Sequence, residues 1–203
     1  QSYGTAATGS AYFGYWAGGS GGTGPSPGAR STTDRLDYSS DTTQCVEKGP
    51  LTSTKYHTGS TGSRSFGYWT GGQPGGGQSD VDRLDYSSDT TTMAPKGPLD
   101  IASYGHDAES SRANGLPTTS LGGAYYMEVT GQKPPEGTGT GYVSGGGSPA
   151  ANSSVQRVDY ANDTATATVR GPLVNTKKGR GSASSLSHGY WGGGFPAPAT
   201  NID

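Results

Sequence analysis

One sequence unit recurs along the chain with a fixed internal spacing. Residues 33–42 read TDRLDYSSDT and residues 81–90 read VDRLDYSSDT. A Gly-Pro-Leu tripeptide follows twelve residues after the Asp of each Asp-Tyr pair, and the three Asp/Gly pairs are Asp37/Gly49, Asp85/Gly97 and Asp159/Gly171. Self-similarity at a period of some tens of residues indicates a repeat architecture, in which each unit packs on its neighbours.

A Gly-aromatic box precedes each Asp-Tyr segment. It reads FGYW at 13–16 and at 66–69, HGYW at 188–191, and in a divergent form AYYM at 124–127. The unit boundaries are therefore predicted near 1–51, 52–99, 100–173 and 174–203, with the last unit incomplete. We expect the Tyr and Trp side chains of the boxes and the Tyr of each Asp-Tyr pair to anchor the core: Tyr15, Trp16, Tyr68, Trp69, Tyr190, Trp191, Tyr38, Tyr86 and Tyr160.

The Asp-Tyr segments alternate as strands do. Leu84 and Tyr86 have one parity, and Arg83 and Asp85 have the other. Such alternation is typical of a strand with one apolar face. The turn formers that follow, and the β-prone residues 165–169, predict a hairpin. The aromatic box and the polar stretch 59–65 predict a second strand pair, giving about four short strands per unit and no helix.

The composition fits a folded all-β protein that owes little to aliphatic residues. The chain has 203 residues, of which 37 are glycines, 13 are tyrosines and 15% are charged. Disordered chains are usually more charged and poorer in aromatic residues. The formal charge of -2 argues against nucleic acid as a partner, no apolar run is long enough for a membrane span, and one cysteine cannot form an intrachain disulfide.

Four-stranded units of about 50 residues are the size of propeller blades. The aromatic strand that ends in Gly-Gly, the Asp-Tyr strand and the Pro-containing loop resemble the kelch-like β-propeller repeat family, although Trp follows Tyr here and is absent from the later strand. The repeats are more similar to the Gly-Tyr-Phe-Gly-Gly and Asp-Tyr-Ser-Asn-Asp-Thr repeat proteins of aquatic phage and environmental sequences. That resemblance implies a structural or surface-binding protein, and it implies no active site.

The last unit stops part-way through the pattern. Residues 200–203 align with 79–82, so the Arg that corresponds to Arg83 has no counterpart. An unpaired half-unit exposes sheet edges, which invite pairing with another chain. Two interpretations stay open: neighbouring subunits complete one another by strand addition in a fibre or ring, or the sequence is part of a longer array.

Candidate catalytic and metal-binding residues have structural explanations. His188 aligns with Phe13 and Phe66, while His57 and His106 have no second ligand at metal spacing. Cys45 aligns with Met93 and Ala167, so we expect a buried apolar residue rather than a nucleophile. No cofactor and no metal are predicted, and a copper oxidase on a kelch scaffold is disfavoured because its Cys-Tyr pair and His ligands are not recognisable.

The repeated acids form an alternative candidate for calcium. Their spacing does not match an EF-hand, and Arg35 and Arg83 lie among them, so turns and ion pairs explain them better. The acids concerned are Asp34, Asp37, Asp41, Asp80, Asp82, Asp85, Asp89 and Asp163.

The third unit carries two additional segments, 102–121 and 130–151. Long loops on a repeat scaffold often bind ligands, and the nearby aromatic residues are suited to stacking on sugar rings, unless the segments pack on a neighbouring subunit instead. The candidate ligand residues are Tyr104, His106, Tyr125, Tyr126 and Tyr142. Asn152 and Asn162 stand in N-glycosylation tripeptides, and Ser and Thr near Pro would accept O-glycans on an extracellular protein.

The sequence therefore predicts a non-enzymatic structural repeat protein. We expect it to belong to an extracellular fibre or a virion appendage, to assemble with itself through sheet edges, and to be able to adhere to surface glycans. The alternative is a monomeric carbohydrate- or receptor-binding β-propeller module.

Overall fold

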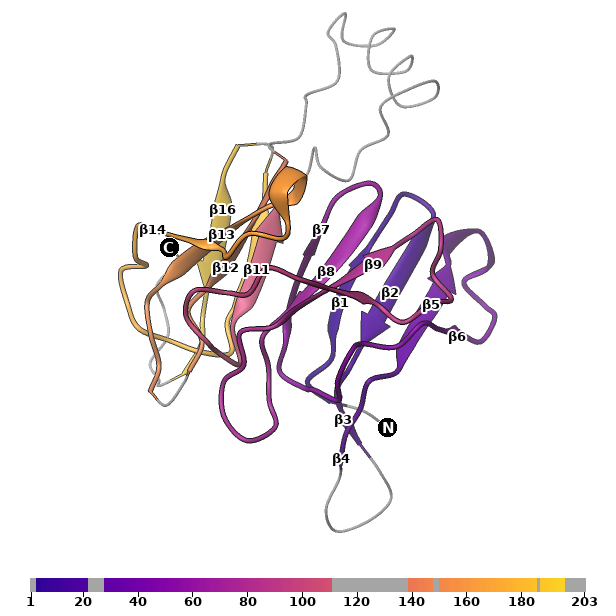
Figure 1. Ribbon diagram of the computed structural model, residues 1–203, viewed down its shortest axis with the longest axis horizontal. Coiled ribbons are helices and arrows are strands. Elements are labelled where there is room, and N and C mark those ends of the chain that lie inside the picture. The colour runs from indigo at the N-terminus through magenta and orange to yellow at the C-terminus, as the bar shows by residue number, and fades with distance from the viewer. Residues whose placement is uncertain (1–2, 22–27, 111–138, 148–149, 186, 196–203) are drawn as a thin grey trace, which may run out of the picture.

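The computed structural model describes residues 3–21, 28–110, 139–147, 150–185 and 187–195. These residues form an all-β protein without an α-helix (Figure 1). Single 3-10 turns at Tyr38–Ser40 and Tyr160–Asn162 follow two of the Asp-Tyr strands. Among the described residues, no helix is long and apolar enough to cross a membrane.

Three antiparallel sheets of four strands follow one another along the chain, and each falls within one predicted unit. The first sheet has the order β1 (Ala6–Gly9), β2 (Phe13–Ala17), β5 (Thr33–Asp37) and β6 (Val46–Lys48). The second contains β7 (Gly59–Gly62), β8 (Phe66–Thr70), β9 (Val81–Asp85) and β10 (Ala94–Lys96). The third contains β11 (Asp107–Ser110), β12 (Thr140–Ser144), β13 (Val155–Asp159) and β14 (Thr168–Arg170).

Two smaller strand pairs complete the described fold. A hairpin of β15 (Gly181–Ser184) and β16 (Gly189–Gly192) follows the third sheet. A short pair, β3 (Ser20–Gly21) and β4 (Gly28–Ala29), projects from the first sheet. The hairpin corresponds to the first two strands of a fourth sheet, because its register repeats that of β1–β2 and β7–β8.

The sequence repeat is also a repeat of strand register. Tyr15 lies opposite Arg35 in the first sheet, and Tyr68 lies opposite Arg83 in the second. Tyr142 lies opposite Arg157 in the third. Each sheet thus places an aromatic ring and a guanidinium side by side on the same face.

The second strand of the third sheet differs from the sequence-based prediction. Residues 124–127 were expected to supply it, but they lie outside the described residues, and Thr140–Ser144 occupies the equivalent register. Residues 140–147 keep the pattern Gly-Tyr-x-x-Gly-Gly with Val143 in place of Trp69. The predicted loop 130–151 was therefore wrong in part, since it contains a central strand.

The Asp-Tyr hairpins have longer turns than expected. β14 begins at Thr168 and not at Ala165, because Asp159 caps the turn: its Oδ1 accepts a hydrogen bond from the Ala161 amide at 3.0 Å. Asp37 and Asp85 accept equivalent bonds from Ser39 and Ser87 at 2.9 Å. A short side chain that bonds the backbone two residues later is a common way to initiate a turn.

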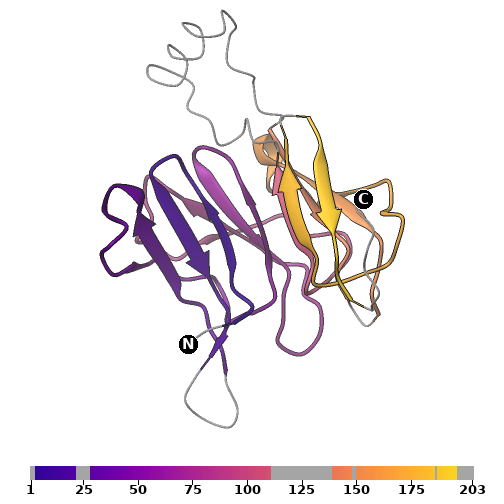
Figure 2. The same ribbon diagram turned by 180° about the vertical axis from the view of Figure 1, so that it is seen from behind.

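The first strands of the successive units lie side by side. β1 packs against β7, β7 against β11, and β11 against β15, so that the sheets fan out from a shared region (Figures 1 and 2). The close approach needs small residues, because a Cβ on Gly62 would lie 2.7 Å from Thr8 Oγ1 and one on Gly141 would lie 2.7 Å from Thr61 Cγ2. These strands line a polar cavity of about 450 Å³. No closed ring is found among the described residues.

Two apolar clusters fill the spaces between the sheets. The cluster between the first and second sheets contains Tyr15, Ala17, Leu51, Trp69, Leu84 and Met93. The cluster between the second and third contains Tyr68, Val81, Leu99, Ala108, Val143, Val158 and Ala167. Each sheet is therefore stabilised mainly through its neighbours, as expected of stacked repeat units.

Candidate interaction site

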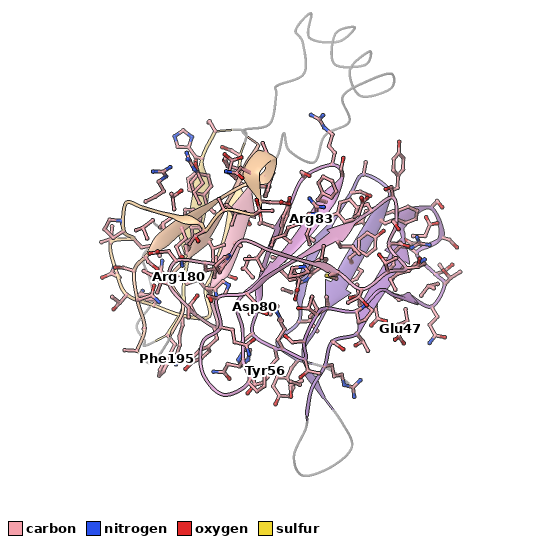
Figure 3. All side chains as sticks on the ribbon, viewed as in Figure 1. Glu47, Tyr56, Asp80, Arg83, Arg180 and Phe195 are labelled. Carbon is pink, nitrogen blue, oxygen red and sulfur yellow. The ribbon has the colours of Figure 1, made fainter. Side chains whose placement is uncertain are left out.

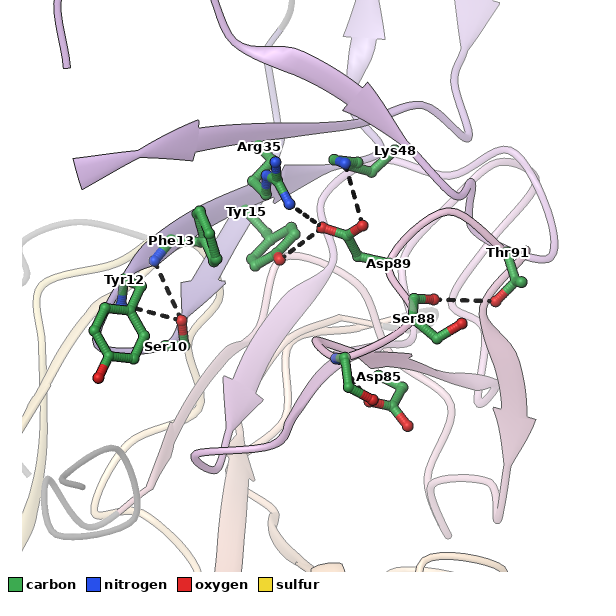
Figure 4. A network of polar contacts seen from close by, with 11 residues as sticks. Ser10, Tyr12, Phe13, Tyr15, Arg35, Lys48, Asp85, Ser88, Asp89 and Thr91 are labelled. Atoms are coloured by element: carbon green, nitrogen blue, oxygen red, sulfur yellow. Dashed lines mark hydrogen bonds and ion pairs between the residues drawn. The ribbon is translucent and has the colours of Figure 1, made fainter. Parts of the chain in front are cut away.

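A buried carboxylate joins the first sheet to the second. Asp89 Oδ2 accepts a hydrogen bond from Tyr15 Oη at 2.9 Å and is 2.7 Å from Arg35 Nη1 (Figure 4). Lys48 Nζ is 3.2 Å from the other oxygen of Asp89. The Gly49 amide of the Gly-Pro-Leu turn donates to the Asp89 carbonyl at 2.8 Å. We call this arrangement of one Asp with a Tyr, an Arg and a Lys a carboxylate cluster.

The cluster perturbs the groups that form it. Burial alone would raise the pKa of the Asp89 carboxyl, but hydrogen bonds from Tyr15, Lys48 and Arg35 outweigh burial and hold that pKa below its usual value. Burial and the neighbouring carboxylate raise the pKa of Tyr15. At neutral pH the cluster therefore holds an ionised Asp and a protonated Tyr, which donates a charge-assisted hydrogen bond.

The same cluster recurs between the second and third sheets. Asp163 Oδ2 is 2.9 Å from Tyr68 Oη and 2.7 Å from Arg83 Nη1. Lys96 Nζ is 3.3 Å from Asp163 Oδ1, and the Gly97 amide donates to the Asp163 carbonyl at 2.7 Å. Repetition at nearly identical distances shows that the cluster is a property of the unit and not of one local environment.

Stacked tyrosines accompany both clusters. The rings of Tyr15 and Tyr86 are 5.1 Å apart with an interplanar angle of 13°, and those of Tyr68 and Tyr160 are 4.9 Å apart with an angle of 11°. In each pair, one ring comes from an aromatic box and the other from the Asp-Tyr segment of the next unit. Burial raises the pKa of Tyr160 to about 12, so its hydroxyl stays protonated.

The third sheet carries the same kinds of side chain, but within the part of the chain that the structure describes no carboxylate forms an ion pair with them. Tyr142, Arg157 and Arg170 occupy the positions of Tyr68, Arg83 and Lys96. None of them forms an ion pair within the described residues, and Arg157 is half-buried while Arg170 is exposed. Gly171 is exposed, whereas Gly49 and Gly97 are buried. We refer to Tyr142, Arg157, Arg170 and Gly171 as the open cluster.

A largely apolar groove of about 490 Å³ adjoins the open cluster. One wall comes from the third sheet and includes Tyr142, Val155 and Leu173, and the other comes from the β15–β16 hairpin and includes Trp191. In the second sheet, Leu84 and Met93 pack beside Trp69 in the interface with the first sheet. The hairpin supplies the corresponding Trp, and the groove lies where counterparts of Leu84 and Met93 would pack.

The first sheet has the complementary exposed face. Asp41, which aligns with Asp89 and Asp163, is exposed, and Tyr38 and Trp16 are 50% and 37% exposed. The expectation that Cys45 is buried was wrong, because the Cys45 side chain is exposed. Met93 and Ala167 are buried in the same position by the turn of the preceding sheet, and the Pro50 and Pro98 carbonyls accept hydrogen bonds from their amides. No sheet precedes the first one among the described residues.

The predicted anchors differ in burial according to their position in the array. Tyr15, Tyr68 and Trp69 are fully buried, and the rings of Tyr86 and Tyr160 stack in the interfaces. Tyr190 is 46% exposed, and Trp191 is half-buried with its Nε1 unpaired.

The three histidines lie in different environments. His106 is buried, with Nε2 accepting from the Gly59 amide at 3.1 Å and Nδ1 3.0 Å from Ser103 Oγ. Burial lowers its pKa to about 4, so it is a neutral structural residue. His188 is exposed. His57 has a φ of 55°, the same left-handed conformation that the aligned glycines Gly4, Gly105 and Gly179 adopt. No group of three His, Cys, Asp or Glu suited to a metal exists among the residues that the structure describes.

Most of the acids that were considered as calcium ligands form ion pairs or cap turns. Asp80 and Asp82 both bind the buried Lys55, with Asp82 Oδ2 2.8 Å from its Nζ. Asp37 and Asp85 cap turns, and the hydrogen bonds from Ser39 and Ser87 lower the pKa of each carboxyl.

The candidate ligand residues do not form one site. Tyr142 lies at the open cluster, whereas Tyr104 lines a separate hollow of about 480 Å³ with His57, Lys178 and Phe195. Lys178 Nζ lies 5.2 Å from the Tyr104 ring centre. Figure 3 shows Phe195 and Tyr56 toward the same lower end of the molecule. Tyr125 and Tyr126 lie outside the described residues.

The two candidate glycosylation sites differ in accessibility. Asn162 is exposed on a turn. Asn152 is half-buried, and its Nδ2 donates to the Gly146 carbonyl at 3.3 Å while its Oδ1 accepts from Ser154. A glycan on Asn152 would have to replace that contact.

The sequence predicted Arg35 and Arg83 as counter-charges of the repeated acids, but it did not identify the Tyr and Lys that complete each cluster, or the Asp of the next unit as their partner. Part of the signal was present, because Arg and Lys recur thirteen residues apart in the first two units, at Arg35/Lys48 and Arg83/Lys96, and the second and third units each have an Asp at the position of Asp89. No protein-family model and no curated protein matches this sequence, so the assignment of function rests on the geometry.

Proposed function

We propose that the chain is a non-enzymatic structural subunit of an extracellular fibre or virion appendage that assembles with itself through its sheet edges. The observation that carries the proposal is the open cluster. Two copies of the carboxylate cluster hold sheets together, and a third copy of its Tyr and cationic side chains forms no ion pair with a carboxylate among the residues that the structure describes. Arg157 is half-buried and Arg170 is exposed, and each would gain a charge-assisted hydrogen bond if a carboxylate of another chain occupied this site.

The arrangement of the sheets supports a kelch-like propeller as the finer form of the fold. First strands lie side by side around one cavity, and each sheet runs outward from it in chain order. On this proposal the β15–β16 hairpin is the inner half of a fourth blade, and a neighbouring subunit completes it. The proposal places the protein outside the cell or on a virion, where glycans on exposed positions such as Asn162 are compatible with assembly.

The proposal is tested by sedimentation velocity combined with electron microscopy. Wild-type protein should form species larger than one chain, and a variant with both Arg157→Gln and Arg170→Gln should shift toward the single chain. Arg30→Gln, which removes an exposed positive charge next to the β3–β4 pair, serves as the control and should behave as wild type. A wild-type protein that remains a single chain at high concentration would contradict the proposal.

A second candidate function is a monomeric carbohydrate- or receptor-binding module. The hollow with Tyr104, Lys178 and Phe195 favours it, because exposed aromatic rings beside a cation suit sugar stacking. Glycan-array binding by a monodisperse single chain, lost in Tyr104→Ala, would support this alternative.

A further inference from the structure

We infer that the open end binds a two-strand repeat segment from another polypeptide chain, with the pattern Asp-Arg-Leu-Asp-Tyr, then Asp-Thr, then Lys-Gly-Pro-Leu. This inference rests on the proposed function and specifies the partner of the open cluster. The segment would add its first strand to β16 and place its turn carboxylate on Tyr142, Arg157 and Arg170.

The free edge of β16 gives the docking position. β2, β8 and β12 each pair with a strand on both sides, whereas β16 pairs only with β15 among the described strands. An unpaired strand presents backbone N–H and C=O groups that another strand can satisfy. The added strand would be antiparallel, as β5, β9 and β13 are in their sheets.

The established registers predict which residues meet. Tyr15 and Tyr68 lie opposite Arg35 and Arg83, so Tyr190 should lie opposite the Arg of the added strand. Gly14 and Gly67 lie opposite Leu36 and Leu84, so the Leu of the added strand should lie opposite Gly189. A shift of one residue would turn that Leu away from the groove, so the groove selects a single register.

The open cluster specifies the carboxylate. In both complete interfaces one Asp accepts from a Tyr hydroxyl, an Arg and a Lys, and the neighbouring turn amide donates to its carbonyl. Tyr142, Arg157, Arg170 and the Gly171 amide repeat all four donors. Glu109 lies opposite Tyr142 and lines the same groove, but it forms no ion pair with Arg157 or Arg170 among the described residues. The two positive charges therefore favour a carboxylate of the segment over a neutral side chain.

The groove specifies the apolar residues and the Tyr. The Tyr of the segment would stack on Tyr142, as Tyr86 stacks on Tyr15 and Tyr160 on Tyr68. The Leu and the small apolar residue after the turn would pack between Leu173 and Trp191, as Leu84 and Met93 do in the interface with the first sheet. Strand edge, charge and apolar groove thus all indicate the same kind of segment.

The direct test is binding of a synthetic peptide with the sequence of residues 81–99. Binding is followed by fluorescence anisotropy at protein concentrations at which the wild type sediments as a single chain. We expect saturable binding that weakens about tenfold or more when the peptide carries Asp89→Asn, because a charge-assisted hydrogen bond is lost. The protein variant with Arg157→Gln and Arg170→Gln should lose binding similarly, and Arg30→Gln should not.

The outcomes separate this inference from the proposed function. Absence of saturable binding, or equal binding of the Asp89→Asn peptide, would overturn the inference even if the protein forms fibres. Specific peptide binding by a protein that never self-associates would uphold the inference and contradict the fibre role.

Discussion

The closed interface between the first two sheets and the open end of the third sheet are built from the same residue types. At the closed interface, Tyr15, Arg35 and Lys48 surround Asp89, which is 7% exposed. At the open end, Arg157 and Arg170 form no ion pair with any carboxylate of the described residues, and no Asp occupies the place that Asp89 has beside Tyr15. The difference teaches that each unit contributes half of an interface at each of its two ends. Whether a given position is buried therefore depends on whether another unit packs against it.

The carboxylates of the two regions show the same contrast in their pKa values. Asp89 has a lowered pKa because its hydrogen bonds with Tyr15, Lys48 and Arg35 outweigh burial. Asp107 lies on β11, where burial, reinforced by Glu109, raises its pKa to about 6 despite Arg180. The closed interface stabilises negative charge, and the strand beside the β15–β16 hairpin does not.

The largest expected loss of stability follows substitution of Trp69, whereas substitution of the equivalent Trp16 should have a small effect. Trp69 is fully buried in the interface, and its Nε1 donates to the Ala6 carbonyl at 3.0 Å. Trp69→Ala should lower the free energy of unfolding by about 4 kcal/mol, the usual cost of removing a large buried ring. Trp16→Ala at the exposed face should cost less than about 1 kcal/mol. Urea denaturation of both variants measures the difference, and equal losses would contradict the comparison.

The aligned acids provide the next test. Asp89→Ala leaves Arg35 and Lys48 without their acid and should lower the free energy of unfolding by about 3 kcal/mol. Asp41→Ala removes an exposed carboxylate and should change it by about 0.5 kcal/mol or less. Both variants lose one negative charge. Equal changes in the free energy of unfolding, measured by urea denaturation, would show that the carboxylate cluster does not stabilise the fold.

The pH dependence of stability tests the region around Asp107. His106 has a folded pKa near 4, below its ordinary 6.5, so its contribution is lost as pH falls from about 6.5 to 4. Asp107 has a folded pKa near 6, above its ordinary 3.8, so its contribution is lost as pH rises from about 4 to 6. The two effects oppose each other in the wild type.

Asp107→Asn should therefore make the free energy of unfolding depend more strongly on pH in the acidic range. Between pH 4 and 6 the slope of the free energy of unfolding should become steeper than in the wild type by about 1.4 kcal/mol per pH unit, with stability falling on acidification. Urea denaturation at several pH values measures the slope. Parallel wild-type and variant profiles would contradict a raised Asp107 pKa.

Substitution of Cys45 should change the free energy of unfolding least of all. The rate at which its thiol reacts tests the difference between the exposed face and the closed interface instead. Cys45 is exposed, so its thiol should react with a disulfide reagent at the rate of a free thiol. In a Cys45→Ser background, Met93→Cys places a thiol in the buried equivalent position, where reaction should be slower by roughly a hundredfold because the interface must open first. Similar rates would show that the interface is not closed.

Strand alternation and turn chemistry were sufficient to predict the strands of the complete units. The parity of Leu84, Tyr86, Arg83 and Asp85 predicted β9, and the register of β8 and β9 confirms the alternation. β12 was missed because Val143 replaces the Trp by which the aromatic box was identified. The strand pattern survives that replacement, since Gly141 and Gly145 keep their places.

The burial of individual side chains and their contacts with the next unit could not be predicted in the same way. Alignment treats Cys45, Met93 and Ala167 as equivalent, but only a unit with a preceding sheet covers that position. The carboxylate cluster joins residues 74 positions apart in the case of Tyr15 and Asp89, a contact that strand periodicity within one unit does not report. Comparison of residues between successive units would have been needed to find it.

The most direct test of the central claim is an electron cryo-microscopy map of the purified native protein at the edge of β16. We predict density for an added antiparallel strand along β16, with a carboxylate from its turn in contact with Tyr142 and Arg157. Discrete single-chain particles with an unpaired β16 edge and no carboxylate at Arg157 would contradict the claim.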